Sequence, residues 1–146
     1  MKKIFKFLGI LLPWFIGGII FRSNQIFYKS LNKPFFAPPG WLFAIIWPIL
    51  YILIAISIYK VKDKNKDYLK VLIINYFSNQ IFSFFFFTIK SPFIAMVDTI
   101  IILISSPYLY LESKKDNKLS ANLLIPYILW NIFASILIIS VYIMNI

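Results

Sequence analysis

The chain has 146 residues, of which 61% are apolar and only 14% are charged, whereas soluble domains are about half apolar and about a quarter charged. This composition, with a mean hydropathy of +0.83, excludes a soluble globular fold. The absence of Cys and His excludes disulfides, thiolate nucleophiles, zinc sites and histidine-bound haem, and the formal net charge of +10 needs its own explanation.

Five segments are long and apolar enough to cross the ~30 Å hydrocarbon core of a bilayer, which takes about 20 helical residues. They are apolar on every side, so we expect helices rather than the alternating strands of a barrel. We predict an all-α membrane protein, a single domain over residues 1–146 that forms a bundle of five transmembrane helices. The predicted spans are residues 5–21, 41–59, 69–89, 92–111 and 121–144.

The first segment begins like a signal peptide, with Lys2, Lys3 and Lys6 ahead of an apolar stretch. No cleavage site of small residues follows before Arg22, so we expect this segment to be retained as the first helix.

The connection over residues 22–40 contains Pro34, Pro38 and Pro39. Three prolines restrict its conformations and remove three amide donors. We therefore expect a stiff lid over the helix ends. The alternative is an aromatic belt at the level of the lipid headgroups.

Basic residues are divided unequally between the two ends of the predicted helices. Four lie on the side of the Pro-rich connection, and eleven lie on the other side, at the N-terminus and in residues 60–70 and 114–118. By the positive-inside rule, the N-terminus is cytoplasmic and the C-terminus lies outside, in the cytoplasmic membrane. The net charge then reflects membrane orientation, and we expect no nucleic-acid partner.

Three motifs resemble those of the tryptophan-rich sensory proteins, whose mitochondrial members are called the translocator protein or peripheral benzodiazepine receptor. Residues 27–43 read FYKSLNKPFFAPPGWLF and are followed by WPILY at 47–51. Residues 79–87 read NQIFSFFFF, and residues 123–134 read LLIPYILWNIFA. They occur in the family's order over most of the chain.

The resemblance implies a five-helix bundle, usually a homodimer, with a pocket capped by the first connection. It implies a porphyrin such as protoporphyrin IX, or another flat hydrophobic molecule, as ligand, with no required cofactor and the lipid bilayer as surroundings. Flat aromatic faces suit such a ligand, and a few polar groups orient it. The expected ligand-binding residues are Tyr28, Phe36, Trp41, Trp47, Tyr51, Asn79, Phe82, Phe86, Asp98, Tyr127, Trp130 and Ala134.

Two kinds of charged residue need separate interpretation. Asp98 is the only acid within a predicted span, so it either contacts the ligand or is a buried structural partner. Arg22, Lys29 and Lys33 are candidates to meet the propionates of a porphyrin at the pocket mouth. We predict no metal site and assign no catalytic residue.

The sequence departs from the family at Phe27, Phe36 and Phe82, where Trp is usual. Phe keeps the apolar face but lacks the indole N–H and much of the photochemistry of Trp.

From the resemblance and the residues that carry it, we predict a membrane protein that binds porphyrin in order to sense, deliver or degrade it. The alternatives are a light-dependent porphyrin-degrading enzyme, a small-molecule transporter, and a structural or regulatory membrane subunit.

Overall fold

The computed structural model describes residues 1–146 and contains helices and no strands. It confirms the predicted all-α membrane fold, because five helices are long and apolar enough to cross a bilayer. These spans are Lys2–Ile20, Gly40–Lys60, Lys66–Thr88, Pro92–Asp116 and Lys118–Met144. Large apolar side chains on their outer faces are widely exposed, as a lipid-facing surface requires.

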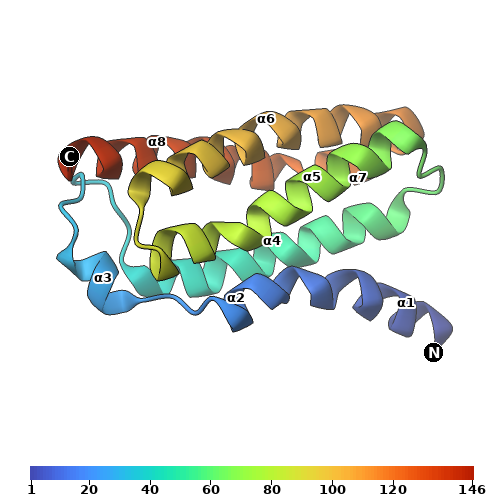
Figure 1. Ribbon diagram of the computed structural model, residues 1–146. Helices are drawn as coiled ribbons and strands as arrows, with labels where there is room; N and C mark the ends of the chain where they lie inside the picture. Colours follow the sequence, from blue (N-terminus) through green and yellow to red (C-terminus); the bar gives the residue numbers. More distant parts are fainter.

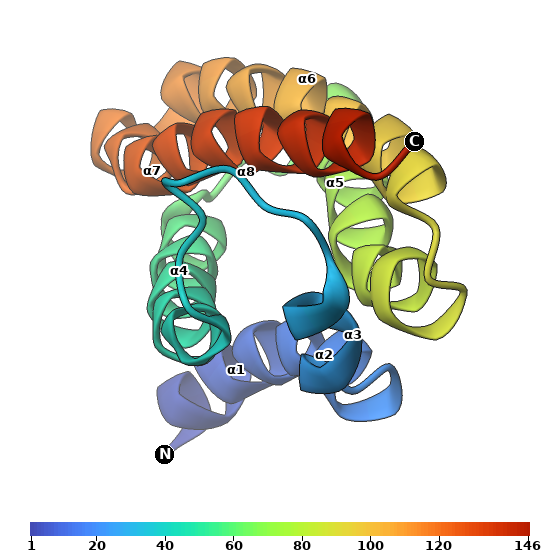
Figure 2. The ribbon, with the colours of Figure 1, turned by 90° about the vertical axis from the view of Figure 1, so that its left-hand side faces the viewer.

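The helices form a ring around a central space (Figure 2). The first span contacts α4 through α1 and α5 through α2, and α6 joins α5 to α8 on the opposite side. The ring closes where α4 meets α7 and α8. Its members are α1 (Lys2–Leu11), α2 (Ile16–Ile20), α4 (Gly40–Lys60), α5 (Lys66–Ser83), α6 (Pro92–Asp116), α7 (Lys118–Asn122) and α8 (Ile125–Met144).

The first and third spans are not regular along their whole length. Pro13 lies in a 3₁₀ turn, η1 (Leu12–Phe15), that separates α1 from α2. The third span ends in a π-helical turn, η2 (Phe84–Thr88). Such turns free or shift backbone hydrogen-bonding groups, which inside a membrane need partners from neighbouring helices.

The connection after the first span contains a short helix, α3 (Gln25–Ser30), that the sequence did not predict. Asn24 caps it, since its Oδ1 accepts a hydrogen bond from the amide of Phe27 at 3.0 Å. The rest of this connection crosses the end of the bundle beside the C-terminus (Figures 1 and 2).

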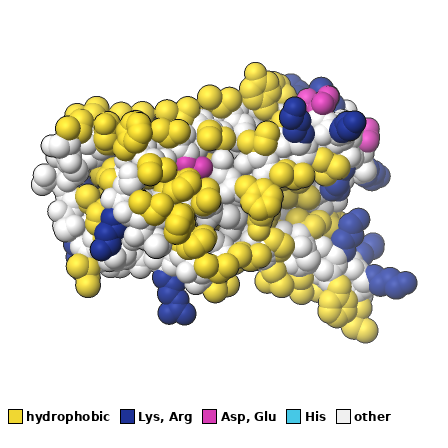
Figure 3. All heavy atoms as spheres, viewed as in Figure 1, with side chains coloured by type: hydrophobic (Ala, Val, Ile, Leu, Met, Phe, Trp, Pro, Cys, Tyr) yellow, Lys and Arg dark blue, Asp and Glu magenta, His cyan; other side chains and the backbone are white.

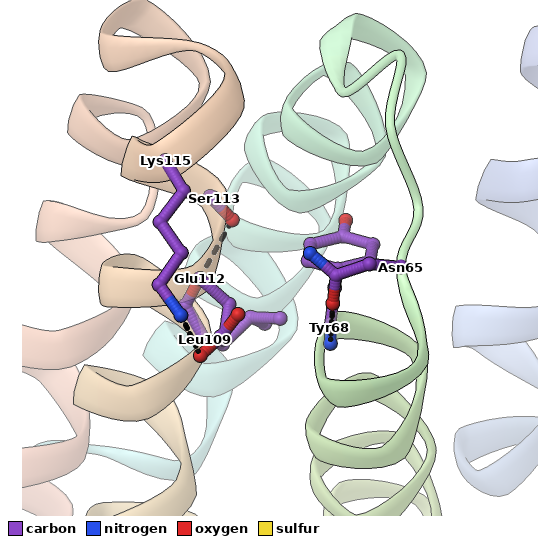
Figure 4. A network of polar contacts seen from close by, with 6 residues as sticks. All are labelled: Asn65, Tyr68, Leu109, Glu112, Ser113 and Lys115. Atoms are coloured by element: carbon purple, nitrogen blue, oxygen red, sulfur yellow. Dashed lines mark hydrogen bonds and ion pairs between the residues drawn. The ribbon is translucent and has the colours of Figure 1, made fainter.

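The other end of the bundle carries most of the Lys and Arg side chains, and the face between the two ends is largely apolar (Figure 3). Helices extend into this charged end, because α6 continues to Asp116 and α7 begins at Lys118. Figure 4 shows polar contacts there: Lys115 Nζ pairs with Glu112 Oε1 at 2.8 Å, and Asn65 Oδ1 accepts from the amide of Tyr68 at 2.9 Å.

Two core clusters fill the bundle. The larger contains the fully buried Ile54, Tyr68, Leu109 and Tyr127, and joins α4, α5, α6 and α8. The smaller contains Tyr28 together with Phe86 and residues of α6 and α8, and partly buried phenylalanines surround it. The half of the bundle near the connection is therefore built mostly from aromatic rings.

Candidate functional site

A cavity of about 1070 Å³ lies inside the ring, beneath the connection of residues 22–40. The first span, α4, the end of α5, α6 and α8 all contribute to its lining. The charged side chains among the lining residues are Lys29 and Lys33, both from the connection. The cavity is therefore apolar in its body and positively charged at its outer border.

The connection is fastened over the cavity by hydrogen bonds. Tyr28 donates its hydroxyl to Pro38 O at 2.6 Å, and burial raises the pKa of this phenol, so the group stays protonated. Asn32 and Asn145 bond reciprocally, from Asn32 N to Asn145 Oδ1 at 2.9 Å and from Asn145 Nδ2 to Asn32 O at 2.8 Å. Lys33 Nζ donates to Tyr28 O at 2.7 Å. These bonds give the expected lid a defined position.

Aromatic rings form opposite walls of the cavity. The rings of Trp47 and Trp130 lie 6.3 Å apart at 88°, and Trp47 also lies 5.5 Å from Tyr51. On the α5 side, Phe82 and Phe86 stack at 5.7 Å and 15°. The indole nitrogen Nε1 of Trp130 is buried without a hydrogen-bond partner, although buried indole donors usually have one. This wall therefore offers flat aromatic faces, and the buried indole donor of Trp130 has no partner within the protein.

A polar network lies at the floor of the cavity. Asn79 Oδ1 accepts from Tyr51 OH at 3.1 Å and from Gln80 Nε2 at 2.9 Å, and Asn79 Nδ2 donates to Tyr127 OH at 3.3 Å. Tyr127 OH in turn donates to Asn75 Oδ1 at 2.8 Å. Such bonds order a core because an unpaired polar group is costly inside a membrane.

The same network reaches the break in the first span. Gln80 Oε1 accepts from Gly17 N at 2.7 Å, and Gln80 Nε2 donates to Trp14 O at 2.9 Å. Tyr76 OH donates to Pro13 O at 2.8 Å. Side chains of α5 therefore satisfy backbone groups at the 3₁₀ turn, as broken membrane helices require.

Most of the residues that the sequence suggested for ligand binding lie at this cavity. Those lining it are Tyr28, Trp41, Trp47, Tyr51, Asn79, Phe82, Phe86, Trp130 and Ala134. The other three, Phe36, Asp98 and Tyr127, do not line it. Tyr127 lies fully buried below it, and Phe36 packs against Phe133 at 6.2 Å. Of the three candidate cations, Lys29 and Lys33 line the cavity and Arg22 does not.

Asp98 is buried away from the cavity lining, on α6. Its Oδ2 has no hydrogen-bond partner in the protein. A carboxylate in this position is expensive to keep charged, so its burial favours a structural role over ligand contact.

Several polar residues within the spans belong to the site but were not predicted from the sequence. Gln80 lines the cavity and clamps the first span, while Asn75 bonds Ser105 and Ser106 of α6 at 2.8 and 3.1 Å. All four side chains are buried. Gln80 directly follows Asn79 in the second motif, so a search for polar residues in apolar spans would have found it.

Comparison with known proteins identifies the family. The profile of the TspO/MBR family matches residues 7–144. "Tryptophan-rich protein TspO" of Bacillus cereus is 35% identical over 136 residues, covering 90% of this chain and 89% of that protein. "Uncharacterized membrane protein YtaB" of Bacillus subtilis is 35% identical and covers 99% of each chain. "Tryptophan-rich protein TspO" of Archaeoglobus fulgidus is 32% identical, over 99% of this chain and 97% of that one. Since the profile and these relatives extend over most of its length, the chain belongs to the TspO/MBR family of multi-pass membrane proteins.

Proposed function

We propose that the protein binds porphyrins or similar flat hydrophobic molecules in the cavity, in order to sense, deliver or degrade them. The observation that carries the proposal is an aromatic-walled cavity of about 1070 Å³ with two lysines at its border. Ligand pockets commonly measure ~300–1,000 Å³ and combine apolar walls with a few polar groups. A volume slightly above that range suits a ligand as large as a tetrapyrrole.

The chemistry of the lining matches the two parts of such a ligand. The ring system stacks on Trp47, Trp130 and Phe82, and the propionates reach the ammonium groups of Lys29 and Lys33. Free-base porphyrin suits the lining better than haem. Axial ligation would fall to Tyr28 or Tyr51, whose hydroxyls are already hydrogen-bonded. We therefore expect no required cofactor.

A fluorescence titration with protoporphyrin IX tests the proposal in purified protein. We expect saturable quenching in the wild type, and binding weakened at least about tenfold, or about 1.4 kcal/mol, in Trp130→Ala and Asn79→Ala. Asn122→Ala is the control, because Asn122 is exposed outside the cavity. Binding equal to that of empty detergent micelles, or unchanged in both variants, would contradict the proposal.

The role of the lysines has its own test. Lys29→Gln should weaken the binding of protoporphyrin IX and leave the binding of its dimethyl ester unchanged, since the ester lacks carboxylates. Lys90→Gln is the matched control, because Lys90 does not line the cavity. Equal losses for the acid and the ester would show that Lys29 does not contact the propionates.

A second candidate function is the light-dependent oxidative breakdown of bound porphyrin. It is favoured by the placement of Trp47 and Trp130 on the cavity wall, with the Nε1 donor of Trp130 unpartnered. Illumination of the complex in oxygen should then bleach the porphyrin Soret band, and Trp130→Phe should abolish the bleaching while binding persists. Bleaching at the same rate in Trp130→Phe would exclude this role for Trp130.

We also expect the protein to act as a homodimer in the cytoplasmic membrane. The family resemblance supports the dimer, and the concentration of lysines at the N-terminal end of the bundle supports a cytoplasmic N-terminus (Figure 3). Mass measurement in lipid nanodiscs would test the dimer directly.

A further inference from the structure

A second hollow lies on the lipid-facing side of the bundle, between α2 and α5. This groove measures about 340 Å³, and its lining includes Ile16, Phe77 and Ile81, whose side chains are all exposed. Gly17, Phe21 and Gln80 line the groove and also line the central cavity. The groove and the cavity therefore lie on opposite sides of one wall, formed by these three residues.

This wall is held by the close approach of α2 to the backbone of α5 at Gly17 and by a few side-chain contacts. Gln80 joins the two helices through its bonds with Gly17 N and Trp14 O, at 2.7 and 2.9 Å. Towards the outer end, the rings of Phe21 and Phe84 lie 5.0 Å apart. Beside them, Gly18 borders the cavity, and a Cβ there would meet no atom within 4 Å. A change of rotamer at Gln80 and a small shift of α2 would connect the groove with the cavity.

The first span is the least anchored part of the ring. Only 11% of it is buried, against 28–39% of each of the other four. Its outer half, α2 (Ile16–Ile20), is five residues long and is separated from α1 by the 3₁₀ turn. A short helical segment between a break and a loop can move without disturbing the rest of a bundle.

The bonds that close the wall have replacements nearby. Gln80 Nε2 already donates to Asn79 Oδ1 at 2.9 Å, so this amide keeps a partner when it leaves Trp14 O. Pro13 O, four residues before Gly17, is the acceptor that Gly17 N would have in a regular α-helix, and it becomes available when the 3₁₀ turn releases Ile16 N, which now donates to it beside Tyr76 OH. Exchange of partners makes opening possible inside a membrane, where unpaired backbone groups are costly.

From these observations we propose that ligands pass between the bilayer and the cavity through the seam between α2 and α5, and that the side chain of Gln80 closes this seam. The inference rests on the proposed ligand-binding function. The groove is the outer vestibule, where an apolar molecule dissolved in the membrane first meets the protein. Such a molecule does not have to cross water in order to bind.

The competing route runs under the lid. The lid is fastened by the reciprocal bonds between Asn32 and Asn145, by the bond from Tyr28 to Pro38, and by packing of Phe36 on Phe133. The lid covers one end of the bundle rather than its lipid-facing side, so this route would take a hydrophobic ligand out of the hydrocarbon region before it binds. These features favour the seam.

Reversible cross-linking distinguishes the two routes. The protein has no native cysteines, so the reagent reacts only with the introduced ones. One variant carries Phe21→Cys and Phe84→Cys across the seam, and the other carries Asn32→Cys and Asn145→Cys across the lid. Each is reconstituted in nanodiscs and bridged with a short bis-methanethiosulfonate reagent, and stopped-flow fluorescence follows the binding and release of protoporphyrin IX.

The seam bridge should slow association and dissociation by the same factor of at least about tenfold, because a blocked route changes rates and not equilibrium affinity. Cleavage of the bridge with reductant should restore both rates, and the lid bridge should leave them unchanged. Slowing by the lid bridge instead, or by neither bridge, would overturn the proposal. Absence of saturable binding in the reduced variants would overturn the proposed function, and this inference with it.

A substitution at the closing residue gives an independent measurement. Gln80→Ala should raise the association rate constant at least about threefold, whereas Gln25→Ala, which alters the cavity border at the lid, should leave that rate constant unchanged. A change in Kd with an unchanged association rate would show that Gln80 is a ligand contact and would contradict its role in closing the seam.

Discussion

Lys90 is the one residue with a left-handed backbone, at φ of 60°. It follows η2, where Ser91 N donates to Phe85 O, six residues back, at 3.0 Å and closes the turn after the π-helix. Glycine adopts this conformation without the steric cost that a Cβ carries. The position therefore stores backbone strain in the native protein.

Replacing Lys90 with Gly should consequently stabilise the protein by about 0.5–1 kcal/mol. Thermal unfolding in detergent would measure the change as a higher Tm. Lys70→Gly is the control, since Lys70 lies exposed within α5 and glycine there costs about 1 kcal/mol. A lower Tm for both variants would show that the conformation of Lys90 is not strained.

Asn75 makes three side-chain hydrogen bonds at a fully buried position, to Ser105, Ser106 and Tyr127. Asn75→Leu should destabilise the bundle by about 1–3 kcal/mol, because it leaves the Tyr127 hydroxyl short of a partner. Chemical unfolding in mixed micelles would measure the loss. The exposed Asn122→Leu should stay within about 0.5 kcal/mol of the wild type.

At the scale of elements, the contact between α2 and α5 depends on the lack of a side chain at one glycine. A Cβ at Gly17 would meet the backbone oxygen of Gln80 and lie 2.9 Å from its Oε1, whereas a Cβ at Gly18 would meet nothing. The two glycines are adjacent in the same short helix, and they form a matched pair.

Gly17→Ala should therefore destabilise the protein by about 1–3 kcal/mol, because backbone must move to make room. Gly18→Ala should be neutral or stabilise it by up to about 1 kcal/mol through helix propensity. The Tm values of the two variants test this close approach. Equal Tm values would show that α2 and α5 do not approach closely at Gly17.

The sequence predicted the five-span helical fold because hydrophobic length alone identifies such helices. It did not predict the 3₁₀ turn at Leu12–Phe15, which depends on contacts from Tyr76 and Gln80, more than 60 residues away. Nor did it predict α3, which forms within a stretch too short to be recognised by periodicity.

The sequence did not show which side chains of each span line the cavity. The spans are apolar on all sides, so periodicity does not mark the face that turns inward. The motifs located Trp47, Asn79 and Trp130 at the cavity, but the sequence also suggested Tyr127 and Asp98, which do not line it. Only packing between helices distinguishes a residue that lines the cavity from one that lies beneath it.

At the scale of the whole molecule, the distribution of charge predicts a single orientation in the membrane. The short helix α3, which ends at Ser30, lies at the end of the bundle near the C-terminus, and the turn from α4 to α5, which contains Lys62, lies at the opposite end (Figure 1). In intact cells, a membrane-impermeant maleimide should label a Ser30→Cys variant and leave Lys62→Cys unlabelled until the cells are broken. The reverse pattern would invert the topology.

The reciprocal bonds between Asn32 and Asn145 also bear on how the protein is handled. They tie the residue next to Ile146 to the segment that covers the cavity. A purification tag fused after Ile146 would disturb these hydrogen bonds and weaken the attachment of the lid. A tag placed ahead of Met1 would lie at the opposite end of the bundle. Conflicting affinities between differently tagged preparations would then have a structural origin.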